Sequence, residues 1–154
     1  MQARMQHPAL LIPEAMKALL TLSKVIRKQG LPQATIELVQ LRVSQINGSS
    51  VCVAGNARSA AAAGATVEQR SAVAAWRNTP CFTAAERSAL ALAEAATRLA
   101  DRPDPVPKAI WDEAAKHFTE RELAALVLAI GAANMFNRIN ITTRRIAGAQ
   151  PWES

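Results

Sequence analysis

The chain of 154 residues is predicted to fold as an all-α protein, a compact single-domain bundle of several helices that spans residues 1–154. Three observations predict this fold. Apolar residues recur every three or four positions in each long segment, as they do on the buried stripe of a helix. Three Thr-x-x-Glu or Thr-x-x-Gln capping boxes precede apolar runs, and such boxes mark helix starts. No segment keeps the strict alternation of a half-buried strand.

The first half of the chain carries three helical patterns divided by glycines. Gly30 ends the first pattern, and Asn47-Gly48 breaks the second. Ser49 then stands where the cap of the third helix is expected. The residues before these helices, including His7, are expected to form a frayed leader. We expect the three helices over residues 13–29, 32–46 and 50–63.

Capping boxes place three further helix starts in the second half of the chain. The paired residues are Thr66 with Gln69, Thr83 with Glu86, and Thr119 with Glu122. A shorter helix is expected over residues 108–118. The last helix should run from Glu120 to about Ile146, where Arg144-Arg145 would complement the negative end of the helix dipole. The segment 101–107 contains three prolines and is interpreted as a surface loop between helices of one domain.

The net charge of +6 does not by itself indicate a nucleic-acid-binding protein. The basic excess lies in the first 60 residues and is spread along the helices rather than clustered. No aromatic residues are interleaved with it for base stacking. We interpret these side chains, Arg27 and Arg42 among them, as a solvated helix face, and we expect no nucleic-acid partner.

The distribution of apolar and cysteine residues predicts a soluble cytoplasmic protein. Charged residues recur so often that no stretch reaches the roughly 18 apolar residues of a membrane span, so no membrane partner is expected. The N-terminal segment is interrupted by prolines and lacks the pattern of a secretion signal. Cys52 and Cys81 are far apart in sequence and form no disulfide framework, which favours a reducing compartment.

The residues with the clearest chemical potential lie where the second predicted helix meets the third. Cys52 follows the expected cap by three residues, so the helix dipole and free backbone N–H groups would favour its thiolate. Asn56 lies four residues later on the same helix face, where its amide could orient a substrate or a water molecule. Glu37 could approach this helix start only if the two helices form a hairpin across Asn47-Gly48.

Neither a metal site nor a cofactor is expected. The chain has only two histidines, and its carboxylates are not clustered. Cys52 could also be a small buried apolar residue without a chemical role, as free cysteines often are.

These residues resemble the core of the carboxymuconolactone decarboxylase superfamily, in its alkylhydroperoxidase D-like branch. The resemblance begins with the run Glu37-Leu-Val-Gln-Leu-Arg-Val-Ser-Gln-Ile-Asn-Gly and continues through Ser49-Ser-Val-Cys52-Val-Ala-Gly-Asn56. It extends over most of the chain, through Trp76-Arg-Asn-Thr-Pro80, Thr83-Ala-Ala-Glu-Arg, His117-Phe-Thr-Glu-Arg-Glu-Leu and Asn137-Arg138.

The resemblance implies an all-helical protein that assembles as a homotrimer or homohexamer and acts on a small molecule. It implies a hydroperoxide reductase with a Glu, a Cys-x-x-Cys pair and a His four residues later. In this chain those positions hold Glu37, Ser49, Cys52 and Asn56. The first cysteine and the histidine are therefore missing, which removes the local disulfide partner and the proton shuttle. Cys81 could replace the partner only if its α-carbon came within about 7 Å.

Three hypotheses remain open at this point. The first is a weakened peroxidase with Cys52 as nucleophile and Glu37 assisting, while Ser49 and Asn56 contact substrate. The second is a lyase or proton-transfer enzyme in which Glu37, desolvated among apolar residues, acts as general base. The third is a non-catalytic scaffold, whether a natural relic or a deliberately altered protein.

Overall fold

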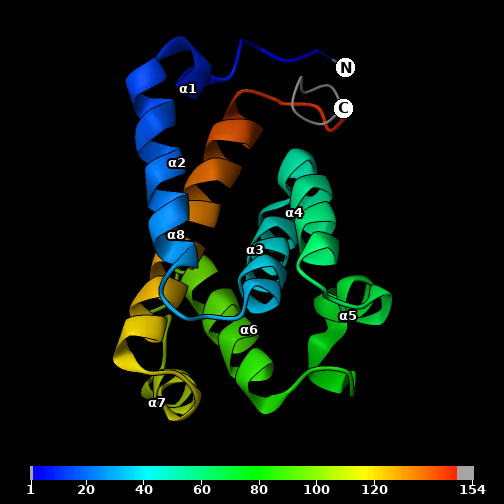
Figure 1. The fold of residues 1–154 in the computed structure, drawn as a ribbon, viewed down its shortest axis with the longest axis vertical. Helices are drawn as coiled ribbons and strands as arrows, with labels where there is room; N and C mark the ends of the chain where they lie inside the picture. The colour runs from blue at the N-terminus through cyan, green and yellow to red at the C-terminus, as the bar shows by residue number, and fades with distance from the viewer. Residues whose placement is uncertain (1, 149–154) are drawn as a thin grey trace.

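All regular elements in the described part of the chain are helices, as the sequence predicts (Figure 1). The computed structural model describes residues 2–148, and no strand occurs within that range. The elements are α1 (Pro8–Leu11), α2 (Pro13–Arg27), α3 (Gln33–Asn47), α4 (Ser50–Ala62), α5 (Val67–Ala72), the 3-10 helix η1 (Val73–Asn78), α6 (Ala84–Thr97), α7 (Lys108–His117) and α8 (Glu120–Thr142).

The three predicted capping boxes are all present. At the starts of α5, α6 and α8, the threonine side chain accepts a hydrogen bond from the backbone N–H three residues later. The side chain of the Gln or Glu at that later position accepts the backbone N–H of the threonine. Gly48 ends α3 in the left-handed conformation, with φ of 73°, which glycine adopts without steric cost. The threonine capping boxes and Gly48 therefore predicted these helix boundaries correctly.

The C-terminal end of α8 differs from the prediction. The helix ends at Thr142 rather than near Ile146, because Arg144 adopts a left-handed conformation with φ of 52°. The Arg145 N–H then closes back on the Asn140 carbonyl at 2.9 Å, as in a Schellman motif. Arg144 and Arg145 thus follow the helix instead of lying in its last turn.

The expectation of a frayed N-terminal leader is also wrong. His7 is 95% buried, and its Nδ1 accepts the Ala9 N–H at 3.1 Å, which caps the short helix α1. Burial, with a contribution from the nearby Arg145, lowers the pKa of the His7 imidazole. Arg4 also donates its backbone N–H to the Thr143 carbonyl at 2.9 Å, so the segments before α1 and after α8 lie side by side.

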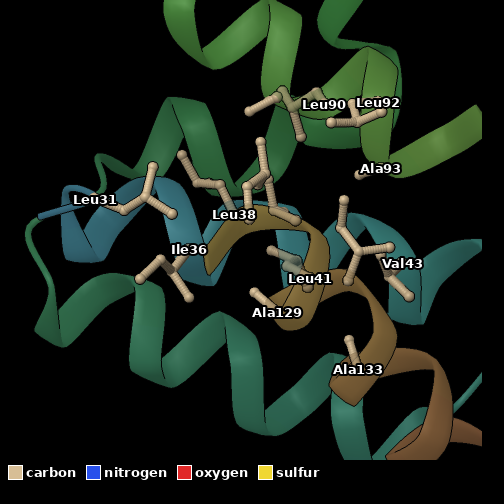
Figure 2. Packing of buried hydrophobic residues seen from close by; sticks show 14 of the residues in the cluster. Leu31, Ile36, Leu38, Leu41, Val43, Leu90, Leu92, Ala93, Ala129 and Ala133 are labelled. Atoms are coloured by element: carbon tan, nitrogen blue, oxygen red, sulfur yellow. The ribbon is translucent and has the colours of Figure 1, made fainter. Parts of the chain in front are cut away.

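Helix α3 is the centre of the bundle. It packs against α4, α6 and α8, and most of its residues are buried on all sides. In Figure 2, Leu38 and Leu41 of α3 lie between Leu90 of α6 and the small side chains Ala129 and Ala133 of α8. Burial of each leucine stabilises the fold by roughly 1.5–3 kcal/mol, and the alanines allow α8 to approach closely.

Helix α8 combines great length with an apolar composition. By those two criteria it could cross a membrane, although the sequence analysis expected no such segment. Half of its most apolar window is buried against the other helices. The core helix of a globular protein passes the same test, so these criteria alone are weak evidence for a membrane span.

Candidate functional site

A cavity of about 180 Å³ opens between α2, α3, α4 and α8, and Cys52 lies in its wall. We call it the thiol cavity. Its lining residues are Ser23, Arg27, Gln40, Cys52, Asn56, Ala132, Ala133, Phe136, Asn137 and Asn140. The two candidate residues Cys52 and Asn56 therefore face the same space, as expected for positions four apart on one helix.

The Cys52 sulfur has a specific hydrogen-bond donor. Asn140 Nδ2 of α8 lies 3.1 Å from Cys52 Sγ. This hydrogen bond, with the sulfur as acceptor, fixes the position of the Cys52 side chain in the cavity wall. Cys52 also occupies the first turn of α4, where backbone N–H groups lack partners within the helix. The sulfur therefore accepts an amide N–H at the start of a helix.

Ser44 organises the amide side chains of the cavity. Its Oγ accepts Asn56 Nδ2 at 3.1 Å and Asn137 Nδ2 at 3.0 Å, and it donates to the Gln40 carbonyl at 2.8 Å. Ser44 is fully buried, so these bonds are shielded from water. The network fixes the orientation of Asn56, the residue at which the resemblance to the alkylhydroperoxidase D-like motif implies a histidine.

The amide network extends beyond the cavity to the end of α3 and to α6. Asn47 Nδ2 donates to Asn134 Oδ1 at 3.0 Å and to Asn137 Oδ1 at 2.9 Å. Asn134 in turn donates to Thr97 Oγ1 at 3.2 Å. These contacts join the end of α3 to α8, and they satisfy polar groups that would otherwise be costly to bury.

Glu37 is buried but does not line the thiol cavity among the residues described. Its Oε1 lies 2.6 Å from Arg27 Nη1 and accepts Gln33 Nε2 at 2.7 Å. The hairpin of α3 and α4 forms as anticipated, but Glu37 lies ten residues before the end of α3, about 15 Å along the helix, whereas Cys52 is in the first turn of α4. Glu37 is therefore connected to the cavity only by its ion pair with Arg27, which lines it.

The pairing of Glu37 with Arg27 corrects two interpretations from the sequence. Glu37 is not desolvated among apolar groups alone, because a guanidinium neutralises it. The basic residues of the first 60 positions are not all a solvated face, because Arg27 and Arg42 each pair with a buried carboxylate, that of Glu37 and that of Glu94.

Ser49 is placed differently from the expectation. It occupies the N-cap position of α4, but its side chain makes no capping bond. Its Oγ is buried and has no hydrogen-bond partner within residues 2–148, and it is not part of the lining given above for the thiol cavity. A buried hydroxyl of this kind costs about 1–3 kcal/mol, so the local structure does not require a serine.

The charged groups of the thiol cavity limit its chemistry. Arg27 is the only charged side chain in its lining as described, and a guanidinium does not give up its proton at physiological pH. No lining carboxylate or imidazole is present among these residues to act as a general base. The described part of the chain also contains no group of three or more His, Cys, Asp or Glu side chains that could hold a metal ion.

The second cysteine has a contrasting environment. Cys81 lies in the segment between η1 and α6, and both cysteines are free thiols. Burial, followed by the nearby carboxylates of Glu68 and Glu86, raises the pKa of the Cys81 thiol. Cys81 is therefore an internal reference for the reactivity of Cys52.

The sequence analysis did not assign a site role to several residues in the wall of the thiol cavity or hydrogen-bonded beside it, although one signal was available. Asn134, Asn137 and Asn140 recur every three residues in a helix that is otherwise strongly apolar. Such spacing places them along one face, and polar residues on a core helix need partners. Arg27 and Ser44 carried no comparable signal, because their roles depend on contacts between helices.

Comparison with known proteins assigns the chain to a family. The model of the carboxymuconolactone decarboxylase family matches residues 13–95. YdfG, an uncharacterised protein of Bacillus subtilis (strain 168), is 30% identical over 129 residues, which are 84% of this chain and 86% of that protein. YnjA, an uncharacterised protein of Escherichia coli (strain K12), is 32% identical over 114 residues, which are 74% of this chain and 61% of that protein.

Solved structures agree with this assignment. A protein of unknown function from Agrobacterium tumefaciens, proposed to be an antioxidant defence protein AhpD, has a TM-score of 0.87 and 30% identity, covering 97% of this chain and 100% of that one. The debrominase Bmp8 shares the fold with a TM-score of 0.79 and 22% identity, covering 89% of this chain and 73% of that one. The chain belongs to the carboxymuconolactone decarboxylase family.

Proposed function

We propose that this protein is a thiol-dependent reductase of small organic hydroperoxides, in which Cys52 is the nucleophile and an external thiol completes the cycle. The observation that carries the proposal is the amide N–H of Asn140 directed at Cys52 Sγ inside a cavity. The likeness to a structure described as an AhpD-type antioxidant protein supports the same chemistry. The missing first cysteine and histidine make the external thiol necessary.

The cavity has two walls that suit such a substrate. Ala132, Ala133 and Phe136 of α8 form an apolar side, which would receive an alkyl or aryl group. Arg27 and Asn56 lie on the polar side, and their N–H groups would bind the peroxide oxygens. No cofactor is part of this proposal.

The proposed reaction has two stages. The Cys52 thiolate attacks one peroxide oxygen, the O–O bond breaks, and the leaving alkoxide takes a proton from solvent to give an alcohol and a sulfenic acid. A thiol then attacks the sulfenic sulfur, releases water and forms a mixed disulfide. A second thiol releases the Cys52 thiolate and forms the external disulfide, so the two thiols supply the two electrons that reduce the peroxide.

Proton transfer by Glu37 is the weaker alternative. A general base must come within hydrogen-bond reach of the proton it removes. Glu37 is instead bound to Arg27 and Gln33, and it is absent from the described lining of the cavity. We therefore assign Glu37 the role of positioning Arg27. The polar cavity and the directed amide also argue against a scaffold without a ligand.

We further propose a cytoplasmic homotrimer or homohexamer, with no nucleic-acid or membrane partner. Exposed apolar side chains on α2 and α8, including Leu20, Val25 and Leu128, support self-association because they would be covered in an oligomer. Sedimentation of the purified protein would test this, and a monomer at micromolar concentration would contradict it.

The experiment that tests the catalytic proposal measures consumption of cumene hydroperoxide with dithiothreitol as reductant. The Cys52→Ser variant should fall to the rate without protein, whereas the matched Cys81→Ser variant should stay within about twofold of the original protein. Dimedone labelling followed by mass spectrometry should find the sulfenic acid at Cys52. Full activity in Cys52→Ser would exclude this thiol, and activity lost in both variants alike would show that the assay does not report one site.

A further inference from the structure

A second cavity, separate from the thiol cavity, lies between η1, α6, α7 and the loop that joins α6 to α7. Its volume is about 310 Å³. Arg77, Arg98 and Arg102 line it together with one carboxylate, Glu94. We call it the arginine cavity. Neither the sequence analysis nor the proposed peroxide chemistry gives these arginines a role.

Glu94 is already saturated by donors. It is 4% exposed, and its Oε1 accepts Arg42 Nε at 2.7 Å and Trp76 Nε1 at 3.1 Å, while Arg42 Nη2 lies 2.6 Å away. Arg77 Nη1 lies 2.6 Å from Oε2. Burial raises the pKa of Glu94, but the bonds from Arg77, Arg42 and Trp76 outweigh it and hold the pKa below its usual value.

The remaining guanidinium groups keep unused donors. Arg98 Nη1 reaches Glu94 Oε2 only at 3.5 Å, and Arg102 forms no ion pair with any residue in the described range. Each guanidinium carries five N–H donors, whereas one carboxylate has about four acceptor sites. The described lining of the cavity therefore holds three arginines, Arg77, Arg98 and Arg102, against the single carboxylate of Glu94, which leaves an excess of positive charge.

The orientation of Arg77 is fixed without help from solvent. Its guanidinium carbon lies 4.3 Å from the centre of the Trp76 ring, and one of its nitrogens is held by Glu94. A planar donor that is already oriented loses little freedom when it binds an anion, which favours a bidentate contact with an oxyanion.

Helix α7 adds a further electropositive group. The helix has ten residues and starts beside the cavity, where Pro107 and Ile110 belong to the lining. Pro107 gives no side-chain cap, and its carbonyl accepts only the N–H groups of Ile110 and Trp111, so those of Lys108 and Ala109 receive no bond from it. The positive end of the helix dipole adds to the arginine charge.

We propose that the arginine cavity binds a small organic oxyanion, a carboxylate or phosphate monoester with a short apolar group. Arg98 and Arg102 would hold the oxyanion, with Arg77 as the oriented third donor. The apolar residues Pro105 and Ile110 on the other wall would contact the hydrocarbon part. This site is additional to the proposed peroxidase site and does not depend on Cys52.

The test is titration calorimetry of the full chain with phenyl phosphate, benzoate and inorganic phosphate at constant ionic strength. The Arg102→Gln variant removes a donor that no described ion pair uses, so the fold should be unaffected. We expect it to weaken binding of the best probe by about tenfold. Arg121→Gln, a matched loss of an exposed arginine on α8, should leave the affinity unchanged.

Each outcome of the titrations is decisive. Preference for phenyl phosphate would identify a phosphate monoester, and preference for benzoate would identify a carboxylate. The proposal is overturned if no probe binds at millimolar concentration, if only inorganic phosphate binds, or if both variants weaken binding equally. Melting curves followed by circular dichroism would verify that Arg102→Gln remains folded.

Discussion

The thiol cavity and the arginine cavity each lie beside a buried carboxylate that is paired with arginine. Beside the thiol cavity, Glu37 is held by Arg27, and the polar part of the wall carries amides and a thiol. In the arginine cavity, Glu94 is held by Arg42 and Arg77, and the wall carries further guanidinium groups. The first cavity therefore offers a thiol, amides and one guanidinium, while the second offers several guanidinium groups and no thiol in its described lining.

The two ion pairs are alike in one respect that limits the chemistry of both cavities. Neither carboxylate is available as a base, because arginine donors occupy both of them. The chemistry of the thiol cavity must then come from Cys52 and the amide directed at it. The arginine cavity has no cysteine, serine or threonine in its described lining, which agrees with the binding role proposed above.

The largest expected effect concerns stability. Glu94→Gln should destabilise the protein by about 3 kcal/mol, because it leaves Arg42, which is 12% exposed, without its buried partner. Glu37→Gln should cost only about 1 kcal/mol, because Arg27 is 41% exposed and can be rehydrated. Urea denaturation of both variants measures this difference. Equal losses would mean that the two ion pairs are energetically alike.

A second thiol placed near Cys52 should raise peroxide turnover, whereas one placed near Cys81 should not. Ser49→Cys recreates Cys-x-x-Cys, and a resolving thiol in the same chain should raise peroxide turnover at least about tenfold. Asn78→Cys builds the same spacing at Cys81 and is the matched control. It should leave turnover unchanged, since Cys81 lacks the cavity. A gain in Asn78→Cys as large as in Ser49→Cys would show that two nearby thiols suffice anywhere.

The amide directed at sulfur can be removed with little change of shape. Asn140→Leu should slow peroxide reduction and alkylation at Cys52 about fivefold, the equivalent of roughly 1 kcal/mol for one hydrogen bond. Cys81 in the same molecule should react as before. Unchanged kinetics at Cys52 would show that Asn140 does not activate the thiol.

The pH dependence of stability should distinguish the original protein from the Glu94→Gln variant. Its pKa is lowered in the folded protein, so its stabilising contribution is present above the unfolded pKa of about 4.3 and is lost as pH falls through the folded pKa. From about pH 5 downward, the original protein should therefore lose more stability than Glu94→Gln. Denaturation at a series of pH values tests this, and parallel curves would contradict it.

The fold was largely predictable because local signals determine it. Threonine capping boxes and Gly48 act within four residues of the boundary they create, and all of them are present in the structure. The end of α8 was not predictable in the same way. Arg144 is an unfavourable residue for the left-handed conformation that ends the helix, so the sequence contains no signal for it.

The candidate site was predictable only where it depends on one helix. Cys52 and Asn56 are four residues apart in α4, and both line the cavity. The roles of Glu37 and Ser49 depend on contacts that spacing cannot show. Arg27 is on a different helix from Glu37, and nothing local indicates that the Ser49 hydroxyl is buried without a partner.

The central claim is that the thiol cavity, rather than the presence of a cysteine alone, makes Cys52 reactive. The most direct measurement is the rate of iodoacetamide alkylation of the Cys52 and Cys81 peptides across pH, followed by mass spectrometry in the same sample. We predict that Cys52 reacts at least about tenfold faster than Cys81 near pH 7. We also predict that the rate of Cys52 begins to rise at a lower pH than the rate of Cys81. Equal rates, or faster alkylation of Cys81, would contradict the account.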